Sequence, residues 1–103
     1  MYRAVVNYEF KKGMEEEGMK FLENELIKKA DQYGCHGLEL LCSEKNACHV
    51  IGIGTWKNIE EAKKFQSKWG AKEKELLRFC VNTPSHEFFN IRSTYTEKSR
   101  KAA

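Results

Sequence analysis

Apolar and polar residues alternate over residues 2–10, YRAVVNYEF, which predicts a β-strand with one apolar face. From residue 14 to residue 33 the period changes, and apolar residues recur at steps of three and four. That spacing predicts an amphipathic helix. Gly34 follows the last apolar position, where glycine commonly ends a helix. The first third of the chain is therefore expected to be a strand followed by a helix.

Residues 37–56, GLELLCSEKNACHVIGIGTW, hold two apolar runs separated by the polar stretch SEKNA. Two strand-like runs around a short polar loop predict a β-hairpin. If the loop is residues 44–46, Cys42 lies opposite Cys48 on one face of the sheet. We expect both residues to be reduced thiols there.

A second helix is expected to begin at Asn58, a good capping residue, with Glu61 three positions later as in a capping box. Its inner face would carry Ala62, Phe65 and Trp69. Gly70 is expected to break or bend this helix, and residues 71–80 to form a further helical piece. The only proline, at position 84, then precedes a final strand over residues 86–95.

The order of these elements is β-α-β-β-α-β, which predicts an α+β, ferredoxin-like domain with a four-stranded antiparallel sheet and helices on one face. Because strand side chains alternate, one residue of each apolar pair must point away from the helices. These pairs are Leu40 and Leu41, Val50 and Ile51, and Phe88 and Phe89. A second copy of the chain is the simplest cover, so we expect a homodimer.

The composition is that of one globular domain of 103 residues, with 41% hydrophobic and 32% charged positions. We expect the domain to span residues 1–96 and residues 97–103 to be a disordered basic tail. The net charge of +3 comes mainly from that tail, and the predicted third strand lacks the basic-aromatic motif of RNA-binding domains, so no nucleic-acid partner is expected. No apolar run approaches the ~20 residues of a membrane span, so we expect no membrane partner and a cytoplasmic protein.

Cysteine and histidine are frequent enough to raise the question of a metal site. The cysteines are Cys35, Cys42, Cys48 and Cys80, and no pair has the C-x-x-C spacing of a zinc site, nor is there an H-x-x-x-H pair. We therefore expect no metal and four reduced thiols.

Residues 34–65 carry three features together: a G-x-x-G before the second strand, a short polar hairpin, and Trp56 followed by the helix start Glu60, Glu61, Ala62. This stretch resembles the antibiotic biosynthesis monooxygenase-like proteins of the dimeric α+β barrel superfamily. The resemblance implies two sheets that pair into a shared barrel. It also implies a pocket in each subunit between the sheet and its own helices.

Quinone-forming members of that family resemble the pattern N-x-x-x-W-x-x-x-x-x-Y. This chain matches the tryptophan with Trp56 but has Gly52 and Ala62 in place of the asparagine and the tyrosine. The triad of the haem-degrading members is also missing, with Val6, Phe65 and Glu75 at its three positions. The resemblance therefore implies no cofactor and assigns no catalytic residue.

Gly52 and Gly54 lie on the same strand face as Trp56, where the family has its pocket. Two missing side chains could enlarge a pocket walled by Tyr8, Phe65 and Trp69. Alternatively, a helix could pack closely on the glycines, with Trp56 as an ordinary core residue. The six candidate pocket residues are Tyr8, Gly52, Gly54, Trp56, Phe65 and Trp69.

His49 and His86 are possible proton-transfer groups because histidine titrates near neutrality. On its strand His49 has the opposite parity to Trp56 and should face away from the helices. His36 is expected to be exposed in a loop.

Two functions remain open. The first is a cofactor-independent monooxygenase that binds a small, electron-rich aromatic molecule and orients and desolvates it for reaction with O₂. The second is a dimeric small-molecule-binding protein without turnover, which the residues at positions 52 and 62 favour.

Overall fold

The computed structural model describes residues 1–97, and their elements follow the predicted order. The expected domain falls within this range, whereas all of the expected tail except Glu97 lies outside the described residues. The first helical stretch is continuous but contains one π-helical segment. The elements are β1 (Tyr2–Glu9), α1 (Glu15–Phe21), the π-helical η1 (Leu22–Leu26), α2 (Ile27–Gln32), β2 (Gly37–Cys42), β3 (His49–Trp56), α3 (Ile59–Leu76), the 3₁₀-helical η2 (Leu77–Phe79) and β4 (Ser85–Asn90).

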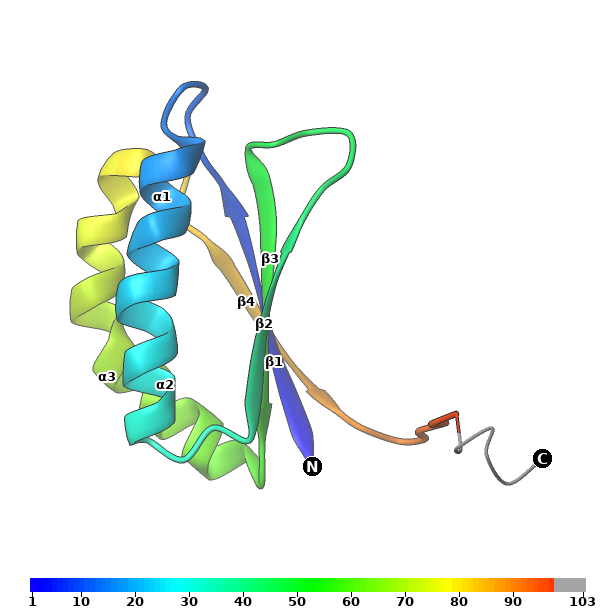
Figure 1. Cartoon of the computed structure of the whole chain (residues 1–103). Coiled ribbons are helices and arrows are strands. Elements are labelled where there is room, and N and C mark those ends of the chain that lie inside the picture. Colours follow the sequence, from blue (N-terminus) through cyan, green and yellow to red (C-terminus); the bar gives the residue numbers. More distant parts are fainter. Residues whose placement is uncertain (98–103) are drawn as a thin grey trace.

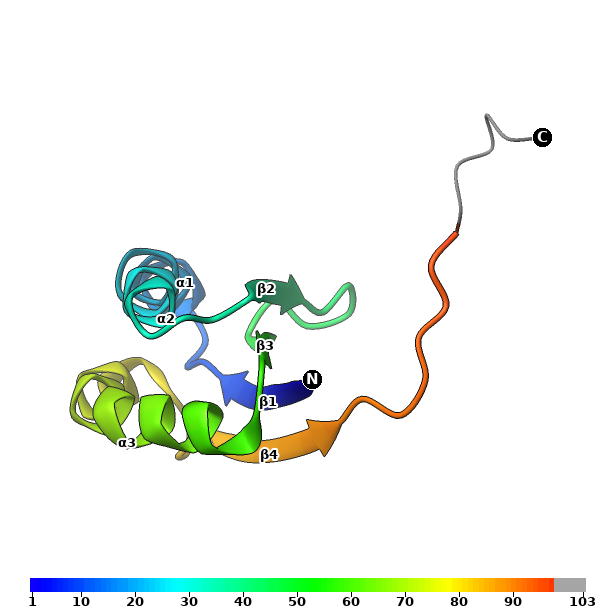
Figure 2. The same cartoon turned by 90° about the horizontal axis from the view of Figure 1, so that it is seen from below.

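The four strands form one sheet in the order β2-β3-β1-β4, and every neighbouring pair is antiparallel. The helices all lie on one side of the sheet, as Figures 1 and 2 show. This arrangement confirms the predicted ferredoxin-like fold. Its central pair, β1 and β3, has a register that places Val6 opposite Gly52 and Tyr2 opposite Trp56.

Strand alternation gives the sheet two different faces. On β3 the residues facing the helices, from Val50 to Trp56, are all buried, whereas those between them are half-buried. The predicted apolar pairs divide accordingly: Leu41, Ile51 and Phe89 are the members that point away from the helices. Their apolar neighbours of the same parity complete what we call the open face, beside which Arg3, Glu39 and Glu87 lie on the same side of the sheet. The residues of the open face are Val5, Leu41, Ile51, Ile53 and Phe89.

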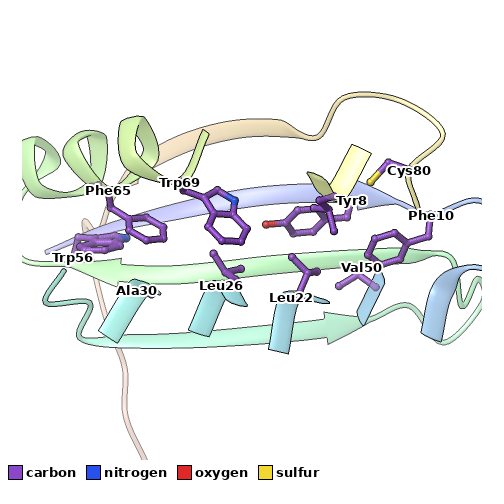
Figure 3. Close-up of a cluster of buried hydrophobic side chains, with 12 residues drawn as sticks. Tyr8, Phe10, Leu22, Leu26, Ala30, Val50, Trp56, Phe65, Trp69 and Cys80 are labelled. Atoms are coloured by element: carbon purple, nitrogen blue, oxygen red, sulfur yellow. The ribbon is translucent and has the colours of Figure 1, made fainter. Parts of the chain in front are cut away.

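The hydrophobic core lies between the other sheet face and the helices, and Figure 3 shows its main side chains. Trp56, Trp69 and Tyr8 are among its largest fully buried members. In α1, Gly18 is buried against the ring of Phe10, where any Cβ would collide with the ring. That close approach explains a glycine near the start of a helix, where helix propensity alone disfavours it.

Three local predictions were wrong or incomplete. Gly70 does not interrupt α3, because Trp69 beside it and Leu76 at the end of the helix are buried and hold the helix against the sheet. A glycine in a helix interior costs only about 1 kcal/mol, which this packing offsets.

β4 ends at Asn90 rather than at residue 95. Its neighbour β1 begins at Tyr2, which lies opposite Asn90, and the backbone N–H of Ile91 still donates to the carbonyl of Met1, 3.1 Å away.

The predicted pairing of Cys42 with Cys48 is also wrong, because Cys42 lies opposite Val50. The loop is longer than expected: the N–H of Ser43 donates to the carbonyl of His49 at 3.0 Å. Cys48 therefore belongs to the loop, where its backbone N–H donates to the side-chain oxygen of Asn46. All four cysteines, which lie within the described residues, are unpaired thiols.

Within residues 1–97, no helix has both the length and the apolar character needed to cross a membrane.

Candidate functional site: an apolar cavity between the sheet and the third helix

A cavity of about 40 Å³ lies between the helix-facing side of the sheet and α3. Residues of β1 and β3 that face the helices form one wall of the cavity, and the inner face of α3 forms the other. Leu26 of η1 also contributes to the lining. The structure brings all six residues proposed from the sequence to this one cavity: Tyr8, Gly52, Gly54, Trp56, Phe65 and Trp69. Cavities that hold one water need only about 10–15 Å³, whereas a dry cavity that accepts benzene measures about 150 Å³. The cavity as it stands is therefore smaller than an aromatic ring.

The two strand glycines make room for aromatic rings rather than for a helix. A Cβ built on Gly52 would lie 3.3 Å from Cε2 of Tyr8, and one on Gly54 would lie 3.1 Å from Nε1 of Trp56. The nearest atoms at both positions are side-chain atoms, none of them from a helix backbone. The predicted alternative of a helix packed on the glycines is thus wrong. Trp56 is nevertheless a core residue, with 1% of its surface exposed, as well as a wall of the cavity.

Aromatic rings form one wall of the cavity. The centroids of Trp56 and Phe65 are 5.1 Å apart, and Phe65 stacks on Trp69 with centroids 6.3 Å apart and an interplanar angle of 13°. Phe65 and Trp69 are four residues apart on α3, so one turn of the helix presents both to the sheet. These rings make the wall apolar, and aromatic rings pack favourably against a planar aromatic ligand.

Besides Gln66, His86 and Glu87, two polar groups belong to this lining, one on Trp69 and one on Tyr8. The indole Nε1 of Trp69 is buried and has no hydrogen-bond partner among the described residues. An unsatisfied buried donor costs about 1–3 kcal/mol, so its presence calls for an explanation. Figure 3 shows the hydroxyl of Tyr8 pointing toward Trp69. Burial first, and then the charge of Glu73, raise the pKa of Tyr8 well above its usual range, so its phenol stays protonated.

A histidine–carboxylate pair lies at the edge of the cavity. His86, on β4, contributes to the lining, and its Nε2 is 2.8 Å from Oε2 of Glu73 on α3. Both side chains are largely buried, with 19% and 16% of their surface exposed. When Nε2 carries the proton that is donated to the carboxylate, Nδ1 keeps a lone pair that can accept another proton. The pair can thus act as a general base.

Sequence reasoning identified His86 as a possible proton-transfer group but missed Glu73. A signal was present, because Glu73 follows Trp69 by four residues and so shares the inner face of α3. The two remaining histidines lie as predicted. His49 faces away from the helices, with Nε2 3.3 Å from the side-chain oxygen of Asn7, and His36 is exposed.

No group of three or more histidine, cysteine or acidic side chains capable of holding a metal ion occurs within residues 1–97. The absence of a metal and of a cofactor in the functional protein remains a prediction from the sequence.

The fold defines a class of structure that known proteins share. SnoaB, a cofactor-independent oxygenase from Streptomyces nogalater, superposes with a TM-score of 0.79 at 17% identity, over 93% of this chain and 97% of that one. The monooxygenase ActVA-Orf6 of Streptomyces coelicolor, solved in complex with nanaomycin D, gives 0.78 at 10% identity, over 94% and 92%. A third structure, of an antibiotic biosynthesis monooxygenase, gives 0.77 at 12% identity, over 90% and 100%.

No family model and no curated protein sequence matches the chain. The chain has the fold of the antibiotic biosynthesis monooxygenase structures, which confirms the resemblance seen in the sequence at the level of fold. At these identities the likeness does not extend to substrate or chemistry.

Proposed function

We propose that the protein binds a small aromatic molecule in the cavity beside Trp56 and oxidises it without a cofactor. The observation that carries this proposal is an aromatic-walled cavity with a largely buried His86–Glu73 pair at its edge, in a fold shared with the cofactor-independent oxygenase SnoaB. Binding would stack the ligand on the row of rings from Trp56 to Trp69. We also propose that the protein is cytoplasmic, as expected from the sequence.

The chemistry needs an activated C–H group on an electron-rich ring, such as the methylene group of an anthrone. His86 would accept the proton that leaves the methylene group, and the resulting carbanion would reduce O₂ directly. One oxygen atom ends in a new carbonyl group, and the other leaves as water with both hydrogens of the methylene group. The substrate supplies all four electrons, so the balance requires no further reductant. The protein contributes orientation, exclusion of water and one base.

An aromatic ligand requires the cavity to expand, because 40 Å³ is less than one ring needs. The residues that would have to move are half-buried side chains at its edge: Leu38, Gln66 and Phe88.

The alternative is a binding protein without turnover. Gly52 and Ala62 stand where the sequence resemblance places an amide and a phenol, and Ala62 is buried in the cavity lining with no polar group to offer. Both functions include a homodimer, in which the open faces of two copies would cover each other.

Oxygen uptake by the purified protein with an anthrone substrate tests the proposal. We expect uptake to require His86, and the variant His86→Gln to be slower by about 10²-fold or more, the usual contribution of a general base. His49→Gln is the matched control, since His49 lies on the opposite sheet face. Saturable anthrone binding without uptake would establish the binding protein instead. Equal rates for the two variants would remove His86 from the mechanism.

A further inference from the structure

Two hydrogen-bond donors of the cavity lining, on Trp69 and Tyr8, have no acceptor within residues 1–97. Trp69 is 2% exposed, and its Nε1–H has no partner within residues 1–97. Tyr8 is 1% exposed as a residue, and no hydrogen bond of its hydroxyl occurs within residues 1–97, although among those residues only the Trp69 nitrogen is a fully buried atom without a partner. Buried donors are normally paired, so the unpaired indole N–H, with a second free hydroxyl at the same cavity, points to a partner from outside the fold.

The two donors belong to opposite walls of the same cavity. Tyr8 projects from β1 and Trp69 from α3, and both contribute to the lining. In Figure 3 the hydroxyl oxygen of Tyr8 points toward Trp69, whose indole nitrogen lies on the side of the ring that faces Tyr8. An oxygen atom placed between them could accept from both, because a carbonyl oxygen has two lone pairs.

The electrostatics of this place favour a neutral acceptor. The raised pKa of Tyr8 keeps its hydroxyl protonated, and the charge of Glu73 is one cause of that rise. The same negative charge would disfavour a carboxylate or phenolate of the ligand, since like charges repel strongly where water is excluded. A ketone or aldehyde oxygen avoids this repulsion.

We propose that Trp69 Nε1–H and the Tyr8 hydroxyl form a two-donor subsite for a neutral carbonyl oxygen attached to the aromatic ring of the ligand. This inference rests on the aromatic binding proposed above but not on turnover. The two donors are not the asparagine and tyrosine of the sequence resemblance, whose positions are occupied by Gly52 and Ala62 in this chain.

Three probes of similar size separate the contributions of shape, acceptor and charge. Acetophenone carries the neutral carbonyl, α-methylstyrene has the same shape without an oxygen, and benzoate is an anion with two acceptors. The chain has only two tryptophans, so two-dimensional NMR of ¹⁵N-labelled protein should show two indole N–H signals. We expect acetophenone to shift the Trp69 signal downfield and to bind about tenfold more tightly than α-methylstyrene, the value of one buried hydrogen bond. Benzoate should bind most weakly.

The variants Trp69→Phe and Tyr8→Phe should each lower the ratio of acetophenone affinity to α-methylstyrene affinity. Tyr8→Phe keeps the ring and removes only the hydroxyl, so it should leave α-methylstyrene binding little changed. Tyr8→Phe is the safer variant for folding, because the hydroxyl bonds to nothing in the described chain. Glu73→Gln should raise the affinity for benzoate more than for acetophenone.

The outcomes separate the two proposals. Equal binding of acetophenone and α-methylstyrene would overturn the donor subsite and leave an aromatic site intact. Failure of all three probes to bind would overturn the aromatic site and the subsite together. Tighter binding of acetophenone than of α-methylstyrene, together with no oxygen uptake with the anthrone substrate, would support the subsite and count only against turnover.

Discussion

At two positions of this sheet, glycine makes room for an aromatic ring. Gly52 lets the ring of Tyr8 lie on β3, and Gly54 does the same for the indole of Trp56. Glycine in a strand interior costs about 0.5–1 kcal/mol through backbone entropy, which close packing of large rings can offset. The two glycines thus contribute to both the core and the cavity, because the same rings belong to both.

The variant Gly52→Asn tests how tightly these rings are packed. We expect it to destabilise the protein by about 1–2 kcal/mol, because its Cβ would lie 3.3 Å from a buried Tyr8 and its amide would need partners. For a domain of this size the melting temperature should fall by roughly 4–8 °C for each kcal/mol. Calorimetry measures this directly.

Gly37→Asn is the matched control, since Gly37 begins β2, is exposed and has no atom within 4 Å of its Cβ position. We expect no fall in its melting temperature. A Gly52→Asn protein as stable as the parent would mean that Tyr8 moves aside easily and that the cavity is larger in solution.

The sequence predicted the positions around the cavity but not their polar interactions. Alternation and helical spacing decide which side of an element a residue occupies, so all six candidates could be placed on the helix-facing side. The orientation of the Trp69 indole depends on its rotamer, and the His86–Glu73 contact joins two elements whose relative placement no local pattern encodes. Those features therefore appear only in the folded structure.

Among the elements, α3 is the one whose start the sequence specified most completely. The side-chain oxygen of Asn58 accepts from the backbone N–H of Glu61 at 2.9 Å, as the capping pattern predicted. By contrast, the β2–β3 register was misjudged because loop length, rather than strand pattern, decides it. A polar loop two or three residues longer changed the partner of Cys42 while leaving its sheet face unchanged.

Asn58→Ala should lower stability by about 1 kcal/mol, because the N–H of Glu61 loses its acceptor at the first turn of α3. Asn58→Asp keeps an acceptor and should recover most of that loss. Asn24→Ala provides the control, since Asn24 is exposed in η1 and its side chain forms no hydrogen bond within residues 1–97. Chemical denaturation of the three variants measures the differences. If Asn58→Ala and Asn24→Ala unfold at the same denaturant concentration, the cap contributes nothing to stability.

At the scale of the whole molecule, the open face is an apolar surface that the chain itself does not cover. Leu41 and Phe89 are each 45% exposed, and Val5, Ile51 and Ile53 lie half-buried between them across the sheet. The helices cover only the opposite face (Figure 2). Contiguous exposed apolar residues mark interaction surfaces in proteins of this size. A second copy of the chain, with its own open face, would bury both at once about a two-fold axis.

The dimer can be tested at the centre of the open face. Ile53 lies opposite both Val5 and Glu39, so Ile53→Glu would place a second carboxylate beside Glu39 in the middle of the proposed interface. We expect the parent protein to sediment at micromolar concentration with twice the 12.0 kDa mass of the chain and Ile53→Glu to sediment as a monomer. Ile27→Glu is the matched control, because Ile27 is 44% exposed on the helical side of the molecule and should leave the dimer intact. Circular dichroism should show that both variants keep their secondary structure. A parent protein that sediments as a monomer would overturn the dimer, and an Ile53→Glu protein that remains dimeric would place the interface elsewhere.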